Sequence, residues 1–233
     1  MDTQDFSRSR ALNNLPSKKL SSAIAAIENS NETGEIKILK LIAINRYAES
    51  NIPIEYWTLK MERDFTGDPR LLDKYNEYIS DLNKNYHTGS SICFAGTHGV
   101  GKTFAATCIL KKACQKGYTC LYTEASKMVA AITQSSNEEK WLAGRELSMV
   151  DFLAIDELDN RFFASEAAND LFAKSFETIF RGRKQNKLPT IICTNSPNLV
   201  ESFQGTLKQS IGSLFADGIQ IFPILGTDYR KNK

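Results

Sequence analysis

Eight consecutive residues of this chain have the types and the spacing that hold a nucleoside triphosphate. The glycines allow backbone angles at which several N–H groups converge on one phosphate. Lys102 supplies a positive charge for the β- and γ-phosphates, and the Thr103 hydroxyl can bind Mg²⁺. The pattern, GxxxxGKT, therefore predicts a site for ATP and Mg²⁺. Its residues, with the adjoining Phe104 as a further candidate contact, are Gly96, Thr97, His98, Gly99, Val100, Gly101, Lys102 and Thr103.

A second set of candidate residues follows the segment 150–155, which is apolar except for Asp151. Asp156, at the end of this predicted strand, can hold Mg²⁺ through water. Glu157, beside it, can polarise the water that attacks the γ-phosphate. The two carboxylates therefore favour hydrolysis over transfer of the phosphate to a small acceptor molecule.

A third candidate is Asn195, which follows another apolar run at positions 189–194. Its side chain is placed to hold the water near the γ-phosphate. The alternative is a simple turn at the end of the strand, since Asn-Ser-Pro is a turn-forming sequence.

The elements that position these residues alternate between short apolar runs and longer amphipathic segments. Strands are expected over residues 91–95, 118–122, 150–155, 189–194 and 219–225, and helices over 71–82, 103–116, 126–133, 138–147 and 166–183. A strand, a glycine-rich loop and a helix in succession form the context that GxxxxGKT needs. This alternation predicts an α/β fold.

The first fifty residues are expected to contain two helices, over residues 18–28 and 35–48. The second carries an apolar stripe of Ile38, Leu41, Ile42 and Ala48, which either packs on the main domain or docks a partner protein. Residues 52–57 are rich in apolar and aromatic groups, which could line an adenine slot or simply belong to the core.

Composition restricts the function classes. The net charge of +2 does not indicate a strongly basic nucleic-acid binder, and no apolar run is long enough to cross a bilayer. The first ten residues lack the apolar core of a signal peptide. The five cysteines occur singly, which favours buried, reduced thiols over a zinc site. Reduced thiols in turn favour a cytoplasmic location.

The order of motifs GTHGVGKT, FLAIDE, PTIICTN and GTDYRK resembles that of the DnaC/IstB-type AAA+ ATPases. That family contains bacterial and phage helicase loaders and the helper ATPases of transposition. The resemblance covers residues 51–231. The first two motifs occur in very many ATPases, whereas the last two are found in a narrower set of proteins.

The resemblance implies a three-layer P-loop AAA+ ATPase domain over residues 51–233, with a central parallel sheet and ATP at the carboxyl ends of its strands. A small helical N-terminal extension over residues 1–50 is a possible partner-binding region. By the same resemblance, residues 52–56 form the segment on the adenine side of the nucleotide. The family pattern makes Lys102, Glu157 and Asn195 catalytic, assigns Thr103 and Asp156 to the metal, and makes Arg230 the second-sensor arginine.

The chain departs from the family in lacking an arginine where one usually reaches the ATP of a neighbouring subunit. Ser213 stands in that region. Either another arginine reaches the site, or the isolated protein is a slow switch that ATP binding alone sets. Arg183, at the end of the helix before Asn195, is a candidate for that arginine, because Arg230 is expected to act within its own subunit. We predict slow ATP hydrolysis by the protein alone. The cysteine-bearing zinc module of some loaders is also absent before residue 90.

Three functions remain open at this stage. The first is an ATP-switched loader that places a replicative helicase on single-stranded DNA, as a homo-oligomer formed on ATP or DNA. The second is an IstB-like transposition helper, and the third is a small-molecule kinase built on the same glycine-rich loop. Lys127, Lys140 and Arg145 are candidate DNA contacts, or parts of a solvated helix face.

Overall fold

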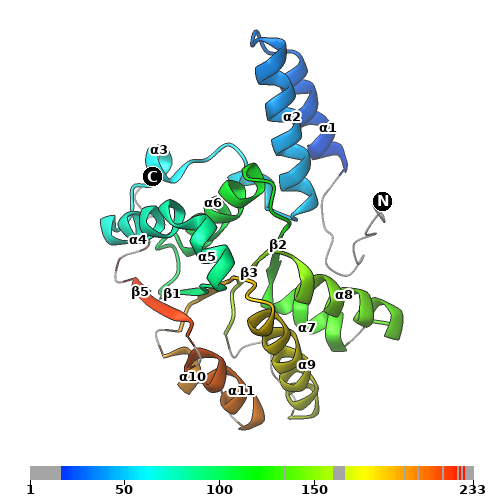
Figure 1. The fold of residues 1–233 in the computed structure, drawn as a ribbon, viewed down its shortest axis with the longest axis vertical. Coiled ribbons are helices and arrows are strands. Elements are labelled where there is room, and N and C mark those ends of the chain that lie inside the picture. Colours follow the sequence, from blue (N-terminus) through cyan, green and yellow to red (C-terminus); the bar gives the residue numbers. More distant parts are fainter. Residues whose placement is uncertain are drawn as a thin grey trace.

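The computed structural model contains a five-stranded parallel sheet with helices on both faces (Figure 1). It describes residues 17–133, 135–159, 166–196, 198–203, 205–216, 218–224, 226 and 228. The strand order is β2-β3-β4-β1-β5. The three-layer α/β fold with a central parallel sheet is therefore confirmed. The strands are β1 (Ile92–Gly96), β2 (Cys120–Glu124), β3 (Phe152–Asp156), β4 (Thr190–Thr194) and β5 (Gln220–Ile224).

The inner strands are apolar throughout because both of their faces are covered. Every residue of β1, β3 and β4 is buried, which is the pattern of strands in a parallel sheet between helices. Successive side chains point to opposite faces. Phe152 and Ala154 belong to one core cluster, whereas Leu153 and Ile155 belong to the other.

Different helices cover the two faces. Helices α3 (Met61–Asp64), α4 (Pro69–Ser80), α5 (Leu82–Thr88) and α6 (Lys102–Gln115), with the 3₁₀ turn η1 (Ile54–Tyr56), surround the first core cluster. The second cluster packs under α7 (Ala125–Thr133), α8 (Asn137–Met149), α9 (Glu166–Gln185), α10 (Leu199–Ser202) and α11 (Gly205–Ala216).

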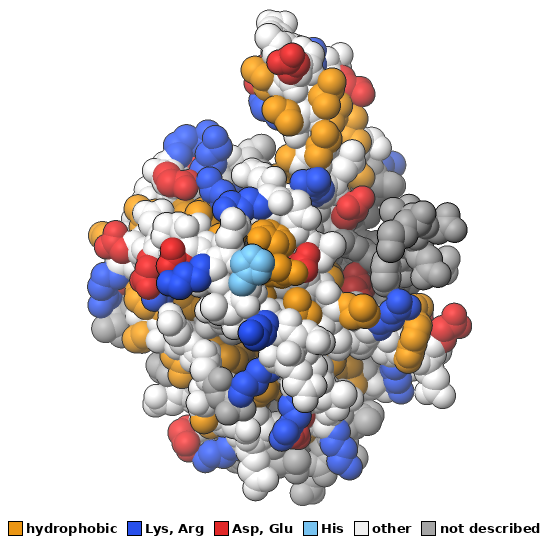
Figure 2. All heavy atoms as spheres, in the orientation of Figure 1, with side chains coloured by type: hydrophobic (Ala, Val, Ile, Leu, Met, Phe, Trp, Pro, Cys, Tyr) orange, Lys and Arg blue, Asp and Glu red, His pale blue; other side chains and the backbone are white. Residues whose placement is uncertain are grey.

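The N-terminal extension is a hairpin of two helices that projects from the domain (Figure 1). Helices α1 (Ser17–Glu28) and α2 (Gly34–Glu49) pack on each other, and only the base of α2, at Tyr47 and Ala48, is buried. Ile38 and Ile42 of the predicted stripe are 59% and 45% exposed. The alternative in which the whole stripe packs on the main domain is therefore wrong. Figure 2 shows hydrophobic side chains along the projecting hairpin.

All five cysteines are buried free thiols, as predicted. Burial raises the pKa of Cys93 to about 12. Within the described ranges, no helix combines the length and apolar character that a membrane crossing requires.

Candidate nucleotide-binding site

The glycine-rich loop, residues 96–103, joins β1 to α6 and requires glycine at two positions. Gly99 and Gly101 have φ angles of +75° and +95°, in the left-handed region that favours glycine. Space is also short, because a Cβ atom on Gly99 would lie 1.7 Å from a carboxylate oxygen of Asp228. On Gly101 it would lie 2.5 Å from the Phe65 ring. Val100, between them, is fully buried and anchors the loop in the core.

Lys102 brings the glycine-rich loop and the end of β4 together. Its ammonium donates hydrogen bonds to the carbonyl oxygens of Gly96, at 2.8 Å, and Thr97, at 2.7 Å. It also donates to Oδ1 of Asn195 at 2.9 Å. Asn195 follows β4, which pairs in parallel with β1, so the two side chains meet although they are distant in the sequence. The structure therefore places these two predicted site residues at one point.

Asp156 and Glu157, at the carboxyl end of β3, have different environments. Asp156 is 4% exposed. Its Oδ1 accepts a hydrogen bond from the Glu157 N–H and its Oδ2 from the Tyr122 hydroxyl, both at 2.8 Å. The Glu157 side chain is exposed, and its φ of +53° is uncommon outside glycine. This turn fixes the first carboxylate and leaves the second open to solvent.

A pocket of 660 Å³ joins these residues, a volume typical of small-molecule sites, which span about 300–1,000 Å³. Gly96, Thr97 and Val100 do not line it: Gly96 and Thr97 contribute the carbonyls that hold Lys102, and Val100 lies beneath the loop. The predicted residues that do line it are His98, Gly99, Gly101, Lys102, Thr103, Phe104, Asp156, Glu157 and Asn195.

The aromatic wall of the pocket was only partly predicted. Ile52 is fully buried, and residues 52–56 line a cavity of 480 Å³ that adjoins Thr103, Asp156 and Glu157, so the assignment of this segment to the adenine side stays a prediction. Tyr56 also lines the pocket of 660 Å³, and its ring lies 6.0 Å from that of Phe104. Phe65 lies 6.1 Å from Phe104 on the segment 63–67, which sequence reasoning missed. The only signal for this segment was an aromatic residue in a loop just before Gly67.

A buried lysine ties this wall to the helix that follows the glycine-rich loop. Lys111 of α6 donates hydrogen bonds to the carbonyl oxygens of Tyr56 and Leu59, and both of these residues line the pocket. Burial lowers the pKa of Lys111. These hydrogen bonds attach the segment of the pocket wall at residues 56–59 to α6.

A second cavity, of 480 Å³, adjoins Asp156, Glu157 and Thr103 on the side of Pro53 and Ile54. Lys127, a predicted DNA contact, lines this cavity and forms an ion pair with Glu124 at 2.7 Å. The Lys127 side chain is 30% exposed, and its assignment as a DNA contact stays a prediction.

Arg183, predicted to reach a neighbouring subunit, cannot do so. It is 1% exposed. Its guanidinium donates to the carbonyl oxygens of Leu147, Val150 and Pro189 at 2.9, 2.8 and 2.7 Å, and to the Thr190 hydroxyl at 3.0 Å. Burial lowers its pKa. Arg183 fastens the end of α9 to β4 and to the segment before β3, and the prediction that it acts across an interface is wrong.

Arg230 lies outside the described residues, as do residues 1–16 of the N-terminal extension. Two described residues before Arg230, Gly226 and Asp228, contact the glycine-rich loop. The Thr97 hydroxyl donates to the Gly226 carbonyl at 3.3 Å, and Asp228 lies against Gly99.

The site can be compared with known proteins. Residues 64–199, more than half of the chain, match the family described as IstB-like ATP binding protein. The chain belongs to this family. The matched segment starts in the pocket wall and includes the glycine-rich loop, both carboxylates and Asn195. No curated protein sequence matches this IstB-like chain.

Solved structures share the fold. The chain superposes on DnaI with a TM-score of 0.59 at 17% identity, covering 76% of this chain and 93% of that one. The DnaC helicase loader gives a TM-score of 0.58 at 18% identity, covering 74% of this chain and 100% of that one. A replication initiator DnaA bound to AMPPCP and single-stranded DNA gives a TM-score of 0.56 at 20% identity, covering 74% of this chain and 50% of that one. The chain thus belongs to the IstB-like family that its motifs indicated, and it shares its fold with DnaI, the DnaC helicase loader and DnaA.

Proposed function

We propose that this protein hydrolyses ATP with Mg²⁺ and uses the nucleotide cycle to load a replicative helicase onto single-stranded DNA. The observation that carries the ATPase part is the convergence of Lys102, Thr103, Asp156, Glu157 and Asn195 on one pocket. These residues come from the carboxyl ends of two parallel strands, β3 and β4, and from the start of α6, and side chains at the carboxyl ends of such strands form the ligand sites of open α/β sheets.

The oxygen atoms of this site suit Mg²⁺, which prefers carboxylate, hydroxyl, water and phosphate oxygens. Thr103 and Asp156 line both cavities and would hold the ion, which neutralises charge on the phosphates when it is bound. Lys102 would exchange its carbonyl contacts for phosphate oxygens. Glu157 would accept the proton of the attacking water, and Asn195 would orient that water.

Glu157→Gln tests this division of roles, since it preserves the shape of the side chain and removes the general base. We expect nucleotide binding to change less than threefold and turnover to fall by about 10² to 10⁴. The measurements are phosphate release and the affinity for a fluorescent ATP analogue. Turnover equal to that of the wild type would refute the role of Glu157.

The helicase-loading part rests on the projecting hairpin and on the shared fold with DnaI and the DnaC helicase loader. Four large apolar side chains of α2 are exposed by 44–67%, which is unusual for a surface with no partner. We infer that they dock the helicase. They are Ile36, Ile38, Leu39 and Ile42.

Leu39→Asp should abolish the complex with the replicative helicase encoded in the same genome, measured by light scattering after gel filtration. Asn45→Asp adds the same charge to an exposed polar position of the same helix and should leave the complex intact. Equal complex formation by both variants would contradict docking through the apolar side chains.

A transposition helper is the second candidate, favoured by the match to the IstB-like family. The site would be the same and the partner a transposase. A stable complex with a transposase, and none with the helicase, would decide for this alternative.

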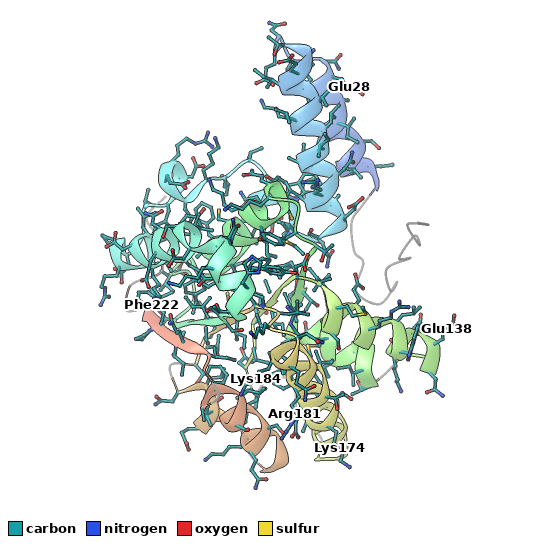
Figure 3. All side chains as sticks on the ribbon, viewed as in Figure 1. Glu28, Glu138, Lys174, Arg181, Lys184 and Phe222 are labelled. Atoms are coloured by element: carbon teal, nitrogen blue, oxygen red, sulfur yellow. The ribbon has the colours of Figure 1, made fainter. Side chains whose placement is uncertain are left out.

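For DNA contact we propose the exposed end of α8, away from the pocket. Figure 3 places Glu138 at the outer end of this helix. Trp141 is 60% exposed, and the Arg145 guanidinium lies 5.3 Å from its ring centroid. Single-stranded bases stack on exposed aromatic rings and on arginine. A homo-oligomer formed on ATP or DNA is part of this proposal.

A further inference from the structure

Tyr122 contacts both Asp156 and the residues that follow the N-terminal hairpin. It is 4% exposed on β2, and its side chain belongs to the same core cluster as Ala154, its partner in the β2–β3 register. Asp156 is two residues beyond Ala154 and therefore on the same face of the sheet. The Tyr122 hydroxyl donates to Oδ2 of Asp156 at 2.8 Å.

The Asp156 carboxylate is consequently oriented at both oxygens. The Glu157 N–H holds Oδ1, and the Tyr122 hydroxyl holds Oδ2. The Cys193 thiol is a further hydrogen-bond partner of this carboxylate. Because an ionised carboxylate has about four lone-pair sites, one remains for another contact. Burial, and then the charge of Asp156, raise the pKa of Tyr122, so this phenol remains a donor at every physiological pH.

The backbone of Tyr122 is held by the base of the N-terminal hairpin. Its N–H donates to the carbonyl of Ser50 at 2.8 Å, and its carbonyl accepts from the Asn51 amide at 3.0 Å. Ser50 and Asn51 are buried, directly after α2, and the Ser50 hydroxyl is 3.2 Å from the Cys114 sulfur of α6. The base of the hairpin is thus wedged between β2 and the helix that follows the glycine-rich loop.

We propose that Tyr122 is a positioning residue that fixes the Asp156 carboxylate for Mg²⁺ and links it to the base of the α1–α2 hairpin. This proposal rests on the proposed ATPase function and adds to it a physical connection between the partner-binding hairpin and the metal. Groups that orient metal-binding carboxylates commonly contribute 10–100-fold to metal affinity. Because Asp156 is expected to act through water, we expect a value near the lower end.

The test is Tyr122→Phe, which removes the hydroxyl and keeps the ring in the core. Binding of a fluorescent ATP analogue is titrated with MgCl₂, and the Mg²⁺ concentration at half-maximal enhancement is recorded. We expect that midpoint to rise about tenfold, while the affinity in EDTA stays within twofold of the wild type. Tyr118→Phe is the matched control, since its hydroxyl contacts Asn83 at an exposed position. It should leave the midpoint unchanged.

A second variant, Asn51→Gly, tests the link to the hairpin. Asn51 has a φ of +55°, which glycine adopts freely, so this change removes only the side chain that holds the Tyr122 carbonyl. We expect a smaller shift of the midpoint in the same direction. In an Asp156→Asn background, Tyr122→Phe should cause no further shift, because the residue acts through that carboxylate.

The outcomes separate the two proposals. Absence of Mg²⁺-dependent binding in the wild type would contradict the ATPase function itself. A wild-type midpoint in Tyr122→Phe, with normal binding in EDTA, would overturn the role of Tyr122 alone. Should Tyr122→Phe fail to fold, a wild-type midpoint in Asn51→Gly would overturn the proposal.

Discussion

We expect Arg183→Met to lower the free energy of unfolding by about 2–6 kcal/mol. The buried carbonyl oxygens of Leu147 and Val150 would lose their donor, which lies at 2.9 and 2.8 Å. The Pro189 carbonyl would keep a hydrogen bond from the Leu153 N–H at 3.3 Å. Because a buried acceptor left without a partner costs about 1–3 kcal/mol, two such acceptors give about 2–6 kcal/mol.

The assay is urea denaturation followed by circular dichroism, with Arg181→Met as the matched control. Arg181 lies two residues earlier on α9 (Figure 3), is 64% exposed and pairs with Glu177. Loss of such a surface pair should cost no more than about 1 kcal/mol. If Arg183→Met unfolds at the same urea concentration as Arg181→Met, the structural role assigned to Arg183 is refuted.

Mixing distinguishes this role from action across an interface. Subunits carrying Arg183→Met and subunits carrying Lys102→Ala should not restore turnover to each other, because Arg183 is buried in its own subunit. Recovery of turnover in the mixture would show that Arg183 acts on the ATP of a neighbouring subunit.

Two other predictions concern thiols and DNA. The native protein should react with a thiol reagent at pH 8 far more slowly than the unfolded chain. All five cysteines are buried, and burial raises the pKa of Cys93 to about 12. Rapid labelling of the native protein would contradict this packing. Trp141→Ala should weaken ATP-dependent binding of single-stranded DNA about tenfold, as loss of one stacked base predicts. Met149→Ala, on the same helix and also exposed, is its control, and equal losses in both would exclude stacking.

The sequence predicted the sheet and the nucleotide site well, because both are encoded locally. Buried parallel strands are continuous apolar runs, and the turns after them are marked by residues with specific backbone or ligand roles. Gly99 and Gly101 are needed for their φ angles. Asp156 ends β3 and Asn195 follows β4, and these two parallel strands end at the same edge of the sheet. Parallel pairing then brings the predicted side chains together.

The errors concern residues whose surroundings come from distant segments. Arg183 was predicted to lie near a subunit edge because it ends the helix before Asn195, yet its acceptors lie in two separate segments, residues 147–150 and 189–190. Phe65 lies in a loop with no periodic pattern, and only the folded chain places it against Gly101. The contact of Tyr122 with Asp156 likewise depends on the register between β2 and β3.

The most direct test of the central claim is the affinity of the wild type and of Lys102→Ala for a fluorescent ATP analogue with Mg²⁺. Lys102 contributes the ammonium that meets Asn195 in the pocket, and no other lysine lines the 660 Å³ pocket as the structure describes it. We predict micromolar binding by the wild type and at least a hundredfold loss in a variant that remains folded by circular dichroism. Wild-type affinity in a folded Lys102→Ala protein would contradict the assignment of this site to ATP.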